Sequence, residues 1–230
     1  MQWNVGNSIF KGYNDKKGIM LCGYEWGFSK EEQEAYKNGK INPIDFQKEP
    51  STFSNKVNLY KKYSLKHYYQ YDERIIKWFG LWGHPLKRDN GEFEKTILQT
   101  NWCDSQNHAF NGNRYHKLLN CKDNFLAHVR EFKPRLIIFL GAEMIKVLNN
   151  PDIKNEFEKI MGKETKPLKF IQKDFPGKRF KIGFQSFENC DIAAFPHPSG
   201  TIGLSDDYIK LFKDEMNPIL VSFKKFKGLS

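Results

Sequence analysis

The 230-residue chain has few cysteines and no long apolar run. Its four cysteines lie far apart, at Cys22, Cys103, Cys121 and Cys190, so no CxxC pair is available for zinc or redox chemistry. The best apolar run, at 136–140, is far shorter than the roughly 18 residues that a membrane-spanning helix needs. We therefore expect reduced, mostly buried thiols, no iron–sulfur cluster and no membrane partner.

Signals for export and for nucleotide cofactors are also missing. The first 18 residues are polar and contain no apolar secretory segment, so we expect an intracellular, cytoplasmic protein. Neither GxGxxG nor GxxxxGK[ST] occurs, which excludes the usual dinucleotide and phosphate-loop fingerprints.

Positive charge and aromatic residues are abundant. The chain has 37 Lys and Arg against 27 Asp and Glu, a formal net charge of +10. This surplus favours anionic partners, nucleic acid before anionic membranes, although lysine-rich surfaces also serve solubility. Aromatic residues make up 15% of the chain, which argues against disorder.

Predicted strands alternate with predicted helices along the chain. Apolar runs predict buried strands at 18–22, 96–102, 135–141, 180–187 and 191–195. Spacing and breakers predict helices near 30–37, 67–79, 118–132, 142–148 and 209–223, the last interrupted at Pro218. Residues 151–180 are interpreted as a lysine-rich excursion over the surface. The alternation predicts one three-layer α/β/α domain over residues 1–230, with a mainly parallel sheet.

Ligands of such sheets bind beyond the carboxyl ends of the strands, and three predicted strand ends carry polar residues. Residues 23–27 read Gly-Tyr-Glu-Trp-Gly, Asn101 ends the second strand, and residues 197–200 read His-Pro-Ser-Gly. Singly, each also suits an ordinary turn, a loop cap or a satisfied histidine. Together at one sheet edge they are much more specific.

These motifs resemble those of the uracil-DNA glycosylase superfamily. The shared features are the first strand with Gly-x-x-x-Gly, the strand ending in Asn101, the Leu-Ile-Ile-Phe-Leu-Gly-Ala run at 136–142, and the final His-Pro-Ser. Their order and approximate spacing agree from about residue 19 to the carboxyl-terminal helix. The resemblance implies a central sheet of about four parallel strands. It also implies a monomeric base excision repair hydrolase that flips a damaged base out of DNA and excises it without a metal or other cofactor.

The resemblance further implies catalytic roles. Glu25 takes the place of the acid that stabilises positive charge on the sugar and orients water. His197 takes the place of the donor to the carbonyl of the departing base, an effect of the kind seen in oxyanion holes. Asn101 aligns with the asparagine that reads the base.

The remaining implied site residues bind rather than react. Gly23, Tyr24 and Trp26 join Asn101 in base binding, and Phe53 is our choice for the aromatic that stacks on the base, with Phe46 as its rival. The implied DNA-binding residues are Gly27, Pro198, Ser199 and Gly200.

Departures from the family pattern leave alternatives open. Trp26 stands where the family mostly has Pro, Gly27 stands where the strictest uracil-specific members have Tyr, and the stretch 28–53 is longer than usual. One alternative, favoured by Trp26, is a weak or inactive glycosylase-fold protein that binds DNA or a nucleobase. Another is an unrelated α/β enzyme. A zinc site remains a minor alternative because its spacing is unusual; the candidate ligands are Cys103, His108, His116 and Cys121.

Overall fold

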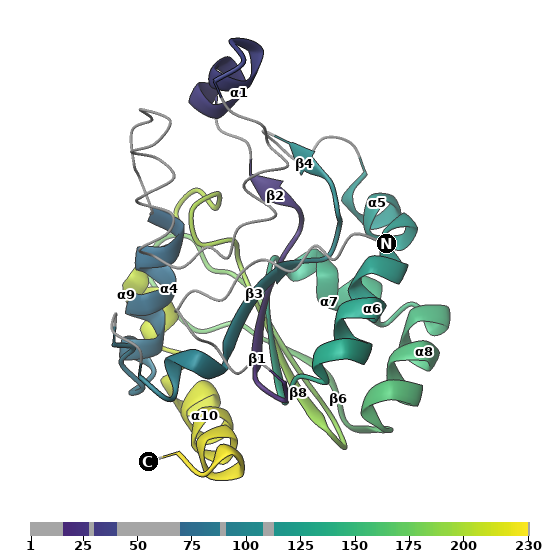
Figure 1. Ribbon diagram of the computed structural model, residues 1–230. Helices are drawn as coiled ribbons and strands as arrows, with labels where there is room; N and C mark the ends of the chain where they lie inside the picture. The colour runs from purple at the N-terminus through teal and green to yellow at the C-terminus, as the bar shows by residue number, and fades with distance from the viewer. Residues whose placement is uncertain (1–15, 28–29, 41–69, 88–90, 108–112, 230) are drawn as a thin grey trace.

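Helices cover both faces of a central β-sheet (Figure 1). The computed structural model describes residues 16–27, 30–40, 70–87, 91–107 and 113–229. Within these residues, apolar side chains from the two helix layers meet the two faces of the sheet in two buried clusters. The predicted α/β class is confirmed.

The central sheet has six strands in the order β3-β1-β5-β8-β7-β6. Four neighbouring strands are parallel, namely β3 (Ile97–Asn101), β1 (Ile19–Gly23), β5 (Leu136–Leu140) and β8 (Cys190–Phe195). Strands β7 (Ile182–Phe187) and β6 (Glu164–Ile171) continue the sheet in antiparallel pairs. The expected sheet of about four parallel strands is thus corrected to a six-stranded mixed sheet.

Residues 151–180, interpreted from the sequence as a surface excursion, contain a helix and a strand instead. Helix α8 (Pro151–Met161) has Pro151 in its first turn, where the missing N–H costs no helical hydrogen bond, so this proline begins the helix. Strand β6 lies at the sheet edge, is largely exposed and contains lysines and Pro167. Such residues discourage further strand pairing at an edge, and they also hide the strand from pattern analysis.

A different set of helices covers each face of the sheet. Helices α4 (Gln70–Leu81), α9 (Asp206–Lys210) and α10 (Lys213–Lys227) cover one face. Helices α5 (Arg114–Asn120), α6 (Lys122–Phe132), α7 (Ala142–Leu148) and α8 cover the other. Shorter elements are α1 (Lys30–Lys37), the 3-10 helix η1 (Glu94–Thr96), and the parallel pair β2 (Trp26–Gly27) and β4 (Gln106–Asn107).

Two predicted helices have different boundaries in the structure. The segment 118–132 divides at Cys121, which caps both α5 and α6. Helix α10 continues through Pro218, because its apolar face stays buried through Met216 and Leu220 despite the lost backbone donor. The interruption in this segment lies at residues 211–212 instead.

Alternation along β1 explains why its sequence is apolar throughout. Ile19 and Leu21 contribute to the cluster beneath α4 and α10, whereas Met20 and Cys22 contribute to the cluster beneath α6 and α7. A strand covered on both faces has no solvent side on which polar residues would be favourable.

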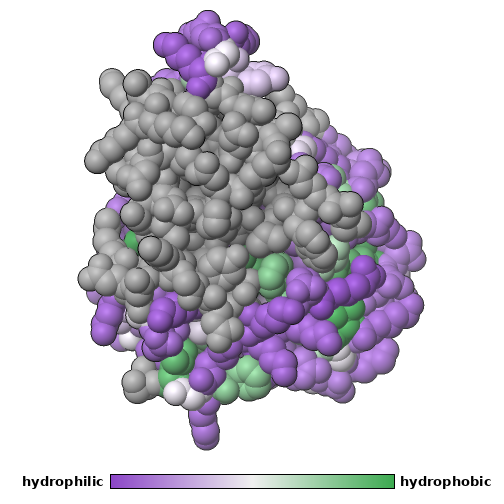
Figure 2. Space-filling model, viewed as in Figure 1, coloured by the Kyte–Doolittle hydropathy of each residue, from purple (hydrophilic) through white to green (hydrophobic). Residues whose placement is uncertain are grey.

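The described surface is mainly hydrophilic on the face shown in Figure 2, with small apolar patches. The described helices include none that is both long enough and apolar enough to cross a bilayer. Cys22, Cys103 and Cys190 are buried, Cys121 is partly exposed, and all four are free thiols.

Candidate functional site at the carboxyl edge of the sheet

Three polar loops leave the sheet at the same edge. Gly23 pairs with Asn101, and Leu140 pairs with Phe195, in parallel register. Because β3, β1, β5 and β8 run in the same direction, the segments that follow them all begin at one edge, which is uppermost in Figure 1. The turn after Gly23, Asn101 and His197 therefore share this edge.

Gly23 and Asn101 lie directly against each other. A Cβ atom added to Gly23 would collide with Oδ1 of Asn101, so the amide lies across the end of β1. The backbone N–H of Trp102 donates to the carbonyl of Gly23 at 2.8 Å, which holds the two strand ends together. A residue with a Cβ at this position would displace the Asn101 amide, and the predicted base-binding pair is in contact.

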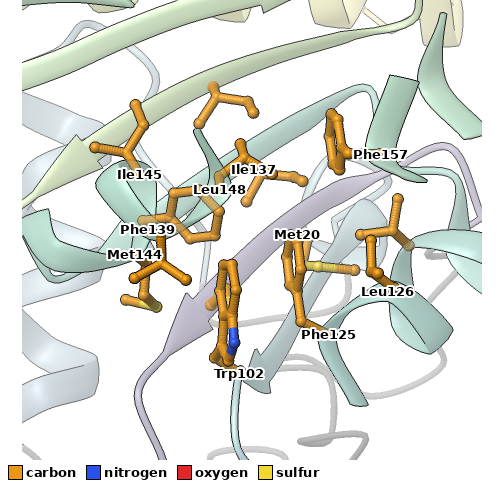
Figure 3. Packing of buried hydrophobic residues seen from close by; sticks show 14 of the residues in the cluster. Met20, Trp102, Phe125, Leu126, Ile137, Phe139, Met144, Ile145, Leu148 and Phe157 are labelled. Carbon is orange, nitrogen blue, oxygen red and sulfur yellow. The ribbon is translucent and has the colours of Figure 1, made fainter. Parts of the chain in front are cut away.

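Trp102 fixes the position of Asn101 through the core. Its side chain is fully buried and stacks on Phe125 with a ring-centre distance of 4.0 Å (Figure 3). Its Nε1–H donates to the carbonyl of Leu118 at 2.8 Å. The amide of Asn124 donates to the carbonyls of both Asn101 and Trp102. Packing and hydrogen bonds thus orient this strand end before any ligand binds.

Tyr24 packs against the turn between β5 and α7. A Cβ on Gly141 would collide with the Tyr24 ring, and the backbone N–H of Glu143 donates to the Tyr24 hydroxyl at 3.4 Å. The Arg114 guanidinium carbon lies 5.7 Å from the ring centre. Burial is the main cause that raises the pKa of Tyr24. The aromatic ring thus joins three segments of this edge, and its base-binding role stays a prediction.

Glu25 is a buried carboxylate in an ion pair. Its side chain is 5% exposed, with Oε2 lying 2.5 Å from Nζ of Lys117. The hydroxyl of Ser105 donates to the same oxygen at 2.6 Å. Lys117 lies on α5 and its side chain is 28% exposed, so this pair links α5 to the turn after β1. Spacing along the chain does not indicate this pairing, and the catalytic role of Glu25 stays a prediction.

His197 has a defined hydrogen-bonding arrangement. Its Nδ1 accepts a hydrogen bond from the backbone N–H of Gly200 at 3.0 Å, and the Ser199 hydroxyl lies 3.4 Å from the same nitrogen. A nitrogen that accepts this bond carries no proton, so the neutral imidazole carries its proton on Nε2.

The surroundings of His197 keep its imidazole neutral. Burial, assisted by the Arg114 guanidinium, lowers its pKa to about 4. At neutral pH the ring is therefore a neutral donor through Nε2. Within the described segments, Nε2 has no hydrogen-bond partner, and His197 is partly exposed.

The loop that carries His197 is fastened to α4. The Arg74 guanidinium donates to the carbonyl of Pro198 and, at 2.6 Å, to the carbonyl of Leu204. Asp206 lies 3.7 Å from Nε of Arg74. Pro198 is buried by this packing, whereas Ser199 and Gly200 are exposed. Of the predicted DNA-binding residues, Ser199 and Gly200 thus lie exposed on this fastened turn, Pro198 is buried within it, and Gly27 lies in β2.

Tyr71 and Arg114 connect the loop that carries His197 to β3 and to the turn after β1. Sequence patterns identified neither residue. The Tyr71 ring lies 5.4 Å from the His197 imidazole. Its hydroxyl is hydrogen-bonded to Gln99 of β3, and burial is the main cause that raises its pKa. Arg114 approaches both Tyr24 and His197. Both residues act across long sequence separations, which composition and spacing do not reveal.

Two other predicted residues, Trp26 and Gly27, form the short strand β2. Trp26 is described through its backbone, which pairs with Gln106, and Gly27 is exposed. Phe46 and Phe53 lie outside the described residues. Their predicted stacking role therefore stays a prediction.

Two cysteines of the possible zinc set are in contact. The Cys103 and Cys121 thiols are hydrogen-bonded, which raises the pKa of Cys103 and lowers that of Cys121. His108 lies outside the described residues. No group of three or more His, Cys, Asp or Glu side chains suited to a metal occurs in the described part of the chain.

Comparison with protein-family models and with curated proteins yields no match for this chain. An α/β fold supports many unrelated chemistries, so the fold alone does not identify an activity. An activity must therefore be inferred from the side chains at the carboxyl edge of the sheet.

Proposed function

We propose that the protein is a uracil-DNA glycosylase-like enzyme that flips uracil or a related deaminated base from DNA and hydrolyses its N-glycosidic bond. The observation that carries this proposal is the neutral His197 imidazole at the same sheet edge as Asn101. The sequence resemblance assigns these positions to a base-carbonyl donor and a base reader. In this proposal, the protein acts as a monomer in base excision repair.

The proposed reaction uses His197 as a hydrogen-bond donor. As the glycosidic bond breaks, its electron pair moves onto the base and positive charge grows on the sugar. Nε2–H of His197 stabilises the negative charge on a base carbonyl, and a neutral donor can do so without giving up its proton. Water adds to the sugar carbon and releases a proton, while the departing base gains one from solvent.

Asn101 is proposed to select the base. An amide offers one acceptor and two donors, which together can match the edge of a pyrimidine. Because Gly23 has no Cβ, the Asn101 amide can occupy the end of β1, and buried Trp102 prevents the strand end from shifting. Selectivity follows if a wrong base leaves these polar groups unpaired.

Glu25 is proposed to act on the sugar side together with Lys117. The carboxylate supplies negative charge near the growing sugar cation, while Lys117 and Ser105 hold its position. The ammonium also offsets part of that charge. Glu25 therefore contributes less to the rate in this proposal than His197 does.

Ile202 supplies an apolar side chain for opening the base stack. It is 84% exposed and follows His197 by five residues on the fastened loop. A base in a duplex must be extruded before its glycosidic bond is reached, and exposed apolar side chains commonly enter the opened base step. An exposed isoleucine five residues after His197 on the same loop fits these two requirements.

The binding-only alternative is favoured by the ion pair of Glu25. A carboxylate already bound by Lys117 and Ser105 is less suited to activating water. This alternative retains base recognition by Asn101 but no turnover. Measuring base release separates the two functions.

The test is a base-release screen on oligonucleotides that contain uracil, hypoxanthine, xanthine or a thymine mismatch, read as alkali-sensitive strand breaks. We expect the parent protein to release at least one base and His197→Ala to do so about 10²–10³-fold more slowly. His116→Ala, at an exposed histidine on α5, is the matched control and should retain the parent rate. Absence of release from every substrate would favour the binding-only alternative.

A further inference from the structure

The turn between β6 and β7, residues 172–181, lies at the same sheet edge as the candidate site. It joins the two antiparallel strands that continue the parallel part of the sheet. Strand β7 is antiparallel to β8, so it begins at the edge where β8 ends. Strand β6 is antiparallel to β7 and therefore ends there as well. The turn and the His197 loop consequently share one edge, uppermost in Figure 1. The four parallel strands implied by the resemblance do not include this hairpin.

The turn is built around a buried tyrosine. The Tyr208 hydroxyl donates to the carbonyl of Phe180 and accepts from the backbone N–H of Lys173 at 3.3 Å. The Phe175 ring lies 5.4 Å from the Tyr208 ring in an edge-on arrangement. Because Tyr208 is fully buried, these contacts fasten the turn at both ends to α9. A fastened turn can present a side chain at a defined position.

Lys178 joins this turn to the loop that carries His197. Its ammonium donates to the carbonyl of Ile202 at 3.3 Å. A Cβ on Gly203 would collide with the Lys178 side chain, and the positive φ of 82° at this residue also favours glycine. The lysine stem therefore lies along the loop backbone beside exposed Ile202. We call residues 172–181 and 197–204 together the hairpin ridge.

The basic side chains of the hairpin turn differ in their ion pairing. Lys173 pairs with Glu215 at 2.5 Å, and Arg179 pairs with Asp174 at 2.9 Å. Lys178 is exposed and, among the described residues, lies within ion-pair distance of no carboxylate. An ammonium has three donors and this one gives a single bond to Ile202, so two donors remain for an anion.

We propose that the hairpin ridge binds the phosphate backbone of duplex DNA, with Lys178 contacting a phosphate beside the base step that Ile202 enters. The choice of DNA as the anion rests on the proposed function. The contact adds affinity without reading sequence, because phosphates are common to every base pair. The added hairpin thus gives this chain a DNA contact beyond the parallel-strand site.

Lys224 provides a matched control at the opposite edge of the sheet. Near it on α10, the Lys227 ammonium donates to the carbonyl of Lys16 at 3.0 Å, and the Phe226 ring lies 4.7 Å from the Arg135 guanidinium carbon. Lys16 and Arg135 precede β1 and β5, so this end of α10 lies at the amino edge. Lys224 is therefore remote from the candidate site.

The experiment measures binding of a fluorescein-labelled duplex with one uracil by anisotropy, with His197→Ala present in every protein to slow excision. We expect Lys178→Gln to weaken binding about tenfold at about 0.1 M salt and to reduce the slope of log affinity against log salt by about one. Lys224→Gln should change neither quantity, and Lys178→Arg should retain binding. Thermal unfolding of each variant checks that the fold is intact.

The outcomes separate this inference from the proposed function. DNA binding that is equally strong in Lys178→Gln and Lys224→Gln overturns the hairpin ridge, whatever the parent protein excises. A selective effect of Lys178→Gln supports the ridge even if the base-release screen finds no activity, in which case the glycosylase proposal fails alone. No binding of the duplex by the starting protein overturns the ridge as well.

Discussion

The two halves of the candidate site are held by different forces. At the ends of β1 and β3, Trp102 is fully buried and the carboxylate of Glu25 is paired with Lys117. After β8, Ser199 and Ile202 are exposed on a loop fastened by hydrogen bonds from neighbouring segments. We therefore expect substitutions in the buried half to lower stability as well as activity. Substitutions in the exposed half should change activity at nearly constant stability.

Removing the tryptophan anchor should have the largest effect on stability. Trp102→Ala deletes a fully buried ring that stacks on Phe125, so the free energy of unfolding should fall by about 3–5 kcal/mol. Urea unfolding followed by circular dichroism measures this change. Val221→Ala, at a half-exposed position on α10, is the control and should change it by less than about 0.5 kcal/mol. A similar loss in both variants would contradict the proposed anchoring role.

His128, on α6 beside Thr100 of β3, and His197 each have a pKa lowered to about 4, mainly by burial. In each case the unfolded chain binds a proton more readily, so folding stability should fall as pH decreases from about 6.5 towards 4. For fully buried His128 alone, this loss is about 3 kcal/mol. Urea unfolding at pH values across this window measures the effect, and His128→Leu should flatten the curve. Equal parent stability throughout the window would contradict the lowered values.

Breaking the buried ion pair should have an intermediate effect. Lys117→Met leaves the Glu25 carboxylate without its ammonium partner, so stability should fall by about 1–3 kcal/mol. Adding Glu25→Gln should recover part of that loss because the buried charge is then removed. A double-mutant cycle based on urea unfolding measures the coupling. Strictly additive losses would show that the pair does not couple these segments.

The smallest stability effect is expected at Ile202. Because this side chain is 84% exposed, Ile202→Ala should change the free energy of unfolding by less than about 0.5 kcal/mol. Excision from duplex DNA should nevertheless slow about tenfold, since the opened base step loses its apolar contact. Excision from single-stranded DNA should change less and serves as the internal control. Equal slowing on both substrates would argue against a role in opening the duplex.

Sequence patterns predicted the strands that are buried on both faces. The apolar runs of β1 and β5 are recognisable because both faces of these strands are covered, and polar residues after parallel strands indicated the shared edge. Edge strand β6 was missed because its exposed lysines and Pro167 resemble a loop.

The contacts that assemble the site could not be predicted from sequence patterns. Lys117 meets Glu25 across 92 positions, and Lys178 meets Ile202 across 24. Tyr71 reaches His197 from a helix on one face of the sheet. These contacts depend on how α4, α5 and the β6–β7 hairpin pack, and local periodicity carries no information about such packing.

The central claim is that neutral His197 at the carboxyl edge stabilises a departing base, and the single-turnover rate of uracil release as a function of pH tests it most directly. The pKa of about 4 predicts release at neutral pH that persists below pH 6.5, and it confines any change caused by His197 to the region near pH 4, where protonation of Nδ1 breaks its hydrogen bond from Gly200. Circular dichroism of the same samples establishes that the protein remains folded. Absence of release at every pH from uracil and from each of the other screened bases, or a loss centred near pH 6.5 in folded protein, would contradict the account.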